Sequence, residues 1–243
     1  MKKKVVGSGR MPAAETLQQD GGKKKSEDEI VQNLFLLYNE FRAIGLPDAL
    51  NEIVFKELST LTGEEYTLSF DMRVGRMPVN GRVHLEANGL GSLYTISYYE
   101  LSLEYPQFPA VRKNSFLCTP FCLVTIEEAV NLLQGRYFYR KPETDPLGEG
   151  YWVFLSEGEL IPGFRRPLFV RNGFRVREFL KVTGLGSWLG VEGYGKLVHD
   201  LEKGYLCDLT LGTGKGMRAV KVEADPAGLR LKVMNGKGVE VGI

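Results

Sequence analysis

The sequence contains few of the residues that build catalytic and metal centres. Among its 243 residues are two histidines and three cysteines, and it lacks the Gly-x-Ser-x-Gly motif of many serine hydrolases. An odd, low number of cysteines does not make a disulfide framework, so we expect reduced thiols in a cytoplasmic protein. With no catalytic motif to build on, we predict that the protein is not an enzyme and uses no cofactor and no metal.

Apolar runs long enough for a membrane are also missing. No segment reaches the ~18 consecutive apolar residues that a membrane span needs. The basic residues Lys2–Lys4 are followed by VVGSGRMPAAE, which has no apolar core of the length found in secretion signals. We therefore expect no contact with a membrane.

A net charge near zero hides an uneven distribution. The whole chain carries +1, but residues 1–25 hold seven basic and two acidic side chains, and the rest of the chain carries −4. The negative charge of residues 26–243 argues against a protein that is covered in nucleic acid over its whole surface. Residues 1–25 show no apolar period, so we predict a disordered basic tail that acts as a solubilising leader or touches phosphates.

The first half of the body changes from a helical period to a strand period. Ser26 and Glu29 match a capping box, and the helix that follows is expected to end at Gly45. Ile30, Leu34, Leu37 and Phe41 form its apolar stripe, which Val31, Phe35 and Tyr38 widen. A second helix is expected over residues 47–63. Alternating apolar residues then predict strands over residues 66–70, 83–87 and 93–105.

The second half opens with a similar signature. Thr125 and Glu128 match a capping box, and the helix that they begin is expected to end at Gly135. Asn172-Gly173 would suit a hairpin, but the apolar residues that follow it stand at helical spacing and favour a helix. The elements expected after Gly135 are strands near residues 137–139 and 151–155 and helices over 174–183 and 194–201.

Two strand segments resemble each other and indicate an internal duplication. VHLEAN at 83–88 matches VKVEAD at 220–225, and each lies about twenty residues after a predicted helix that ends in glycine. The expected fold class is α+β, with two related helix-plus-antiparallel-meander halves. We place a disordered basic tail at 1–25, the N-terminal half at 26–122 and the C-terminal half at 123–243.

The segment LVTIEEAVNLLQGR at 123–136 resembles the signature of an uncharacterised bacterial family. This is a domain-of-unknown-function family common on Bacteroidetes conjugative elements, with a Glu-Ala-x-Asn-Leu-Leu-x-Gly-Arg helix, here Glu128 to Arg136. The similarity covers about residues 48–243, with weaker matches at 65–68, 172–174, 201–204 and 222–226. The chain departs from the family pattern at Tyr205, where Asn is usual, and lacks Asn-Lys after Gly-Arg. The resemblance implies a lineage and an α+β fold, and it transfers no catalytic residue.

Two further patterns look like functional motifs but fit them poorly. GTGKG at 212–216 resembles a phosphate loop, yet Leu209 and Gly216 stand where that loop needs Gly and Ser or Thr. We therefore expect a turn between strands there. Cys118 and Cys122 are spaced wrongly for a zinc knuckle, and no second pair of ligands lies nearby.

The histidines and two carboxylates complete the catalytic candidates. His84 and His199 have no spacing signature for a metal or nucleophile site, so we expect them at the surface. Glu86 and Glu223 are equivalent under the inferred duplication and would be the carboxylates of an enzyme. Strand alternation places both opposite the apolar face, where exposure to solvent is expected instead.

The strongest candidate for a binding site is rich in arginine and phenylalanine. Residues 164–181 carry a local charge of +5, because only Glu178 opposes Arg165, Arg166, Arg171, Arg175, Arg177 and Lys181. Between them lie Phe164, Phe169, Phe174 and Phe179. Arginine grips phosphate in a bidentate manner and exposed rings stack on bases, which predicts nucleic-acid binding. Alternatively, the rings belong to the core and the arginines are solvated or paired with acids.

Two hypotheses for the function follow. The first is a non-catalytic accessory or binding module of a mobile genetic element that contacts nucleic acid through 164–181. The second is a protein-interaction scaffold without nucleic-acid contact, because the meanders offer strand edges and apolar faces to a partner protein. Exposed rings among the arginines favour polyanion binding, and buried rings favour a structural role for the segment.

Overall fold

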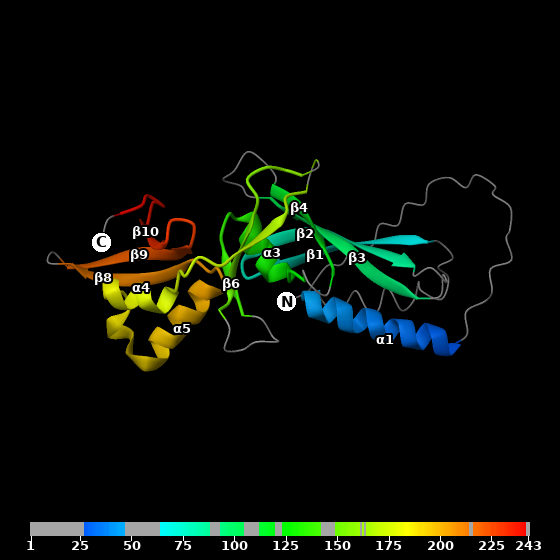
Figure 1. Cartoon of the computed structure of the whole chain (residues 1–243), viewed down its shortest axis with the longest axis horizontal. Helices are drawn as coiled ribbons and strands as arrows, with labels where there is room; N and C mark the ends of the chain where they lie inside the picture. Colours follow the sequence, from blue (N-terminus) through cyan, green and yellow to red (C-terminus); the bar gives the residue numbers. More distant parts are fainter. Residues whose placement is uncertain are drawn as a thin grey trace. The chain divides into compact units, whose positions relative to one another are not determined.

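The computed structural model places most of the chain in an α+β fold with three antiparallel sheets (Figure 1), which confirms the predicted fold class. It describes residues 27–46, 64–87, 93–104, 112–119, 123–141, 149–160, 162, 164–213 and 216–241. The predicted basic tail and the helix predicted over 47–63 lie outside these residues. The chain divides into two compact units, Met1–Val130 and Asn131–Ile243, whereas the sequence placed the boundary between 122 and 123.

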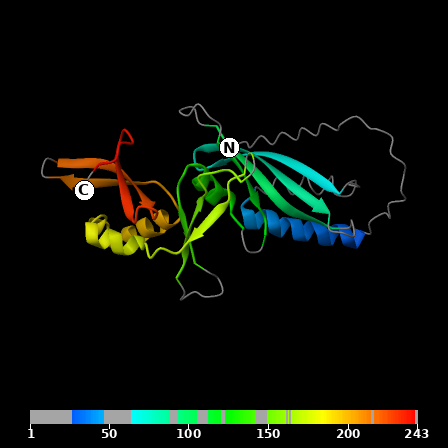
Figure 2. The same cartoon turned by 45° about the horizontal axis from the view of Figure 1, so that its top comes forward.

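The first unit is a helix on a four-stranded meander. Each strand pairs antiparallel with the next along the chain, in the order β1-β2-β3-β4. The helix α1 lies along one face of this sheet (Figures 1 and 2). The bounds are α1 Glu27–Ile44, β1 Glu65–Val74, β2 Met77–Ala87, β3 Tyr94–Leu103 and β4 Arg112–Leu117, and α3, Ile126–Leu133, crosses the division between the units.

The strands alternate as the sequence predicted. In β2, Val83 and Leu85 are buried while Glu86 is exposed. Leu37 and Phe41 of α1 are buried as well, so the apolar stripe of the helix meets the apolar face of the sheet. Burying such side chains stabilises the unit by about 1.5–3 kcal/mol for each large apolar group.

The outer side of α1 differs from the expectation. Val31, Phe35 and Tyr38 are exposed, so the prediction that they widen the buried stripe is wrong. They lie farther around the helix than Leu37 and Phe41, beyond the face that the sheet covers, because a flat sheet covers only one side of a helix.

The second unit contains two three-stranded meanders, β5-β6-β7 and β8-β9-β10, and two helices. Side chains of α4 and α5 share one core with β8, β9 and β10, to which Trp152 of β6 also belongs. The helices lie on one side of the β8-β9-β10 sheet (Figure 1). The bounds are β5 Phe138–Arg140, β6 Tyr151–Leu155, β7 Pro167–Val170, α4 Val176–Thr183, the 3-10 turn η1 Ser187–Leu189, α5 Gly190–Glu202, β8 Cys207–Thr213, β9 Gly216–Asp225 and β10 Arg230–Asn235.

The capping box predicted for α3 is confirmed by its hydrogen bonds. The backbone N–H of Glu128 donates to Oγ1 of Thr125 over 3.3 Å, and the N–H of Thr125 donates to the Glu128 carboxylate over 2.9 Å. These two bonds satisfy donors that the first turn of a helix leaves free. Gly135 follows the helix with φ of 78°, a left-handed conformation that glycine adopts without strain.

The strands that suggested a duplication occupy comparable places. β2 and β9 are each the second strand of a consecutive meander, and Val83 and Leu85 in one are buried like Val220 and Val222 in the other. The first sheet has β4 as an additional strand, and the second unit has the additional β5-β6-β7 sheet. Because meanders recur in unrelated proteins, the duplication stays a prediction.

A buried asparagine joins α1 to the sheet. Asn33 donates from Nδ2 to the backbone carbonyl of Tyr94 over 2.8 Å, and its Oδ1 accepts from the N–H of Tyr94 over 2.9 Å. Both residues are buried, so water is not available to replace these bonds.

We expect Asn33→Ala to lower the free energy of unfolding by about 2–4 kcal/mol, since two buried backbone groups of Tyr94 lose this partner. Urea denaturation measures the effect. Gln32→Ala, at the exposed neighbouring position, is the control and should change the free energy by no more than about 0.5 kcal/mol. Equal losses in the two variants would contradict the role given to Asn33.

Glu40 makes a second contact between α1 and β3. Its carboxylate accepts a hydrogen bond of 2.8 Å from the backbone N–H of Ile96. Partial burial raises the pKa of Glu40, and the hydrogen bond from Ile96 opposes the shift without cancelling it.

This raised pKa gives a pH dependence with a defined sign. The stability that Glu40 contributes is fully present below about pH 4.3, the ordinary glutamate value, and is lost as the pH rises through the raised pKa. Glu40→Gln keeps an acceptor for Ile96 but carries no charge. The stability of this variant relative to the wild type should therefore increase between pH 4 and pH 7 in urea denaturation. Glu192→Gln, at an exposed site, should show no such trend.

Candidate nucleic-acid interface

The basic segment runs from the end of the β6–β7 connection into α4. The helix predicted over 174–183 is confirmed over 176–183. Val176 and Leu180 are buried, and Phe179 packs against the same core. This fixes the rotation of α4, so Arg177 and Lys181 lie on its exposed side, one turn apart.

Two of the four phenylalanines belong to the core of the second unit. Phe174 is 3% exposed, and the ring of Phe179 lies 4.9 Å from it, centroid to centroid. The indole N–H of Trp152 donates to the carbonyl of Phe174 over 3.1 Å. For these two rings the structural interpretation is correct.

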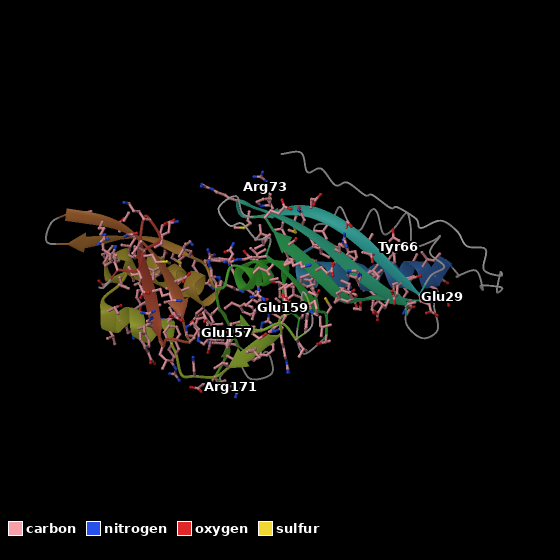
Figure 3. All side chains as sticks on the ribbon, turned by 90° about the horizontal axis from the view of Figure 1, so that it is seen from above. Glu29, Tyr66, Arg73, Glu157, Glu159 and Arg171 are labelled. Atoms are coloured by element: carbon pink, nitrogen blue, oxygen red, sulfur yellow. The ribbon has the colours of Figure 1, made fainter. Side chains whose placement is uncertain are left out.

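Phe169 has a different environment. It is 42% exposed on β7, which is an edge strand, and its ring makes an edge contact with Tyr151 at 5.3 Å. Arg166 and Arg171 are both exposed on either side of β7, and Arg171 projects away from the ribbon (Figure 3). This edge therefore presents a ring and two guanidinium groups to solvent. Phe164 is half-buried.

Two of the predicted basic residues have partners within the protein. Arg175 lies 3.1 Å from a carboxylate oxygen of Glu149 and 3.3 Å from one of Glu178. Hydrogen bonds to Glu149 and Glu178 raise the pKa of Arg175. Arg165 is half-buried and also interacts within the chain. Neither side chain is as free to bind a ligand as the others in the segment.

The remaining four cations, Arg166, Arg171, Arg177 and Lys181, are exposed and make no ion pair with any residue that the structure describes. Of the six predicted residues, these four therefore stay candidates for a phosphate-binding surface. The hydroxyl of Tyr194 on α5 donates to the carbonyl of Arg177 over 2.9 Å and so anchors the backbone of α4.

The structure adds two basic residues that the sequence did not indicate. Lys141, which follows β5, and His199, on α5, lie near enough to Glu202 to act on it together with Arg177. Burial raises the pKa of Glu202, and these three side chains lower it. Lys141 and Arg177 are far apart in sequence and approach through the fold, so no local pattern could have found the pair.

The other sequence motifs have structural settings of their own. Residues 207–213 and 216–225 are paired strands, with Thr213 opposite Gly216, so the GTGKG motif joins two strands of a hairpin and does not precede a helix. Glu86 is exposed, and Glu223 lies 4.0 Å from both Arg136 and Lys232.

His84 lies on the outer face of the first sheet. Its ring stacks on Tyr98 at 4.1 Å, Nδ1 is 3.1 Å from the hydroxyl of Thr67, and Nε2 is 3.7 Å from the carboxylate of Glu100. His199 is exposed on α5. In the described part of the chain, no three His, Cys, Asp or Glu side chains are grouped as metal ligands.

Cys118 and Cys207 are half-buried free thiols, and Cys122 lies outside the described residues. Burial, with the carboxylate of Asp200, raises the pKa of Cys207 to about 12. A thiol with such a pKa carries almost no thiolate near neutral pH, and thiolate is the reactive form.

Comparison of the chain with protein-family models, curated proteins and solved structures gives no match. The resemblance at 123–136 therefore rests on its motif alone. Among the described helices, none is long and apolar enough to cross a membrane.

In a Cys118→Ser/Cys122→Ser variant, we expect the native Cys207 thiol to react with a disulfide reagent near neutral pH on the order of a hundredfold more slowly than in urea. Absorbance of the released thiol follows the reaction. The unfolded chain is the control, because it exposes the same thiol. Equal rates in the two conditions would show that burial does not protect Cys207.

Proposed function

We propose that the chain is a non-catalytic binding module, and that its second unit contacts single-stranded nucleic acid through the exposed part of 164–181. The observation that carries this proposal is the exposed ring of Phe169 on an edge strand that two exposed arginines, Arg166 and Arg171, flank in sequence. A base stacks on the face of such a ring, and arginine binds the phosphates on either side.

The helix α4 extends the same surface along the chain. Arg177 and Lys181 are exposed on one side of α4, and Lys141 and Arg177 both act on the carboxylate of Glu202. A row of cations gains affinity by releasing the counterions of the phosphate backbone, without reading the sequence of bases. Base stacking on Phe169 supplies the preference for unpaired bases, because bases in a duplex present no free face.

A place on a mobile genetic element is proposed from the resemblance of Glu128–Arg136 to the family of conjugative elements. We place this activity in the cytoplasm, in keeping with the free thiols of Cys118 and Cys207.

A protein-interaction scaffold remains the second candidate, and exposed apolar side chains favour it. Val182 of α4, Trp188 of η1 and Val191 of α5 are all exposed where the two helices connect. Exposed tryptophan is common at the centre of protein interfaces. Association through these residues would be insensitive to salt, whereas phosphate binding weakens as salt rises.

We expect Arg171→Glu/Arg177→Glu/Lys181→Glu to weaken the binding of a fluorescent poly-dT oligonucleotide by at least about tenfold. Three lost phosphate contacts should also reduce the slope of log K against log salt by about 2. Fluorescence anisotropy at several salt concentrations measures both quantities. Arg218→Glu/Lys237→Glu, at exposed sites outside the segment, is the control. An equal loss in the control variant, or wild-type affinity that salt does not change, would contradict the proposed site.

Phe169 provides a second variant that leaves the charge intact. Phe169→Ala should weaken binding by a factor that corresponds to about 1–3 kcal/mol, and Phe169→Tyr should retain it, because tyrosine keeps the ring. If both variants bind like the wild type, the surface holds phosphates without stacking, and the proposed selectivity for single strands is wrong.

A further inference from the structure

The helix α1 has a buried apolar stripe and, farther around the helix, a second apolar stripe that is exposed. The inner stripe, which includes Leu37 and Phe41, is buried against the sheet. The outer stripe contains Val31, 64% exposed, Phe35, 66% exposed, and Tyr38, 38% exposed. A surface helix with one partner has polar residues on its outer side, so this stripe is unusual.

The outer stripe has the spacing of a helix–helix seam. Val31, Phe35, Tyr38 and Arg42 follow one another at intervals of four, three and four residues. This is the alternation of the a and d positions of a heptad, with which one helix packs against another helix. Arg42 is exposed and ends the stripe near the C-terminus of α1.

The charged residues at the two ends of the outer stripe are complementary to those of a second copy that lies antiparallel to the first. Asp28 and Arg42 stand at equal distances in sequence on either side of Phe35, and both are exposed. Glu29 adds a second acidic residue at the N-terminal end of the helix (Figure 3). Two antiparallel copies that meet at Phe35 would therefore place each Asp28 opposite an Arg42. A parallel pair would place like charges together.

We propose that the outer stripe of α1 binds the same stripe of a second copy of this chain, antiparallel, with Phe35 at the twofold axis. One patch serves both copies, as in the isologous interface of a symmetric dimer. Antiparallel helices also bring opposite ends of their dipoles together, which adds to the attraction between Asp28 and Arg42. The surface belongs to the first unit and does not depend on the proposed nucleic-acid site.

The oligomeric state of the full chain tests the proposal. Sedimentation velocity over a wide range of protein concentrations should show a monomer–dimer equilibrium, as mass action requires. Phe35→Glu should weaken the dimer by about tenfold to a hundredfold, because it places two carboxylates at the centre of the seam. Ala43→Glu adds the same charge to an exposed position of α1 away from the stripe, and it should dimerise like the wild type.

Charge exchange tests the antiparallel orientation. Asp28→Arg and Arg42→Asp should each weaken the dimer, and the double variant should restore it. The two single variants, when mixed, should form a heterodimer in preference to either homodimer. Circular dichroism of each variant checks that the helix is retained.

Three results would overturn the proposal. The first is a wild-type chain that stays monomeric at all concentrations, which would leave the stripe to a different partner. The second is a dimer that Phe35→Glu does not weaken. The third is a double charge variant that does not recover, which would exclude the antiparallel pairing. Nucleic-acid binding by the monomeric variant would be unchanged, so each proposal fails or survives separately.

Discussion

The two-residue period of the β-strands is the constraint on which both units depend. Because neighbouring side chains of a strand point to opposite faces, a meander buries one face and leaves the other to solvent. In the first unit, Val83 and Leu85 are buried, and Thr67 and Glu86 are exposed. In the second, the buried face of β8-β9-β10 is covered by α4 and α5. Each helix is therefore placed by the need to cover an apolar sheet face.

The period of the backbone also determines which side chains of the basic segment are buried and which are exposed. The segment passes from a strand into a helix, and the period of the chain changes from 2 to 3.6 residues. Phe169 stands on an edge strand and keeps an exposed ring, whereas Phe174 and Phe179 turn into the core. Four phenylalanines that look equivalent in the sequence thus have different roles. One exposed ring among cations suits a single stacked base better than a continuous stacking platform.

Local sequence patterns predicted much of the fold, because the interactions behind these patterns join residues that are close in sequence. The capping box of Thr125 and Glu128 involves residues three apart, and its hydrogen bonds form as expected. The ion pair between Arg175 and Glu149 and the bonds between Asn33 and Tyr94 join distant segments. Whether a basic residue is free or already paired depends on such contacts, so the sequence could nominate six cations but could not separate the four that remain unpaired.

The apolar residues of α1 show a second feature that the sequence alone could not predict. Periodicity predicted correctly that the helix is amphipathic, but it could not separate one broad buried stripe from a buried stripe with an exposed apolar stripe beside it. That distinction depends on how much of the helix the sheet covers. The sheet does not cover Val31 and Phe35, which are exposed. A surface outside the unit would be needed to bury them.

Charged side chains are distributed differently over the surfaces of the two units, and the proposed binding site follows from that difference. On the outer face of the first sheet, burial and the carboxylates of Glu100, Glu65 and Glu86 raise the pKa of Tyr98, and Arg82 stands opposite Glu100 in the strand pairing. On the outer face of β8-β9-β10, acids and bases pair across the strands, as Asp208 and Lys221 do at 3.6 Å. On the segment 164–181, the exposed side chains of Arg166, Arg171, Arg177 and Lys181 make no ion pair with a described residue. At physiological salt, electrostatic forces between exposed groups extend over about 8 Å, so a phosphate chain responds to each surface locally and not to the net charge of the protein. If the proposed site is correct, a phosphate chain binds at the basic segment although the protein as a whole is nearly neutral.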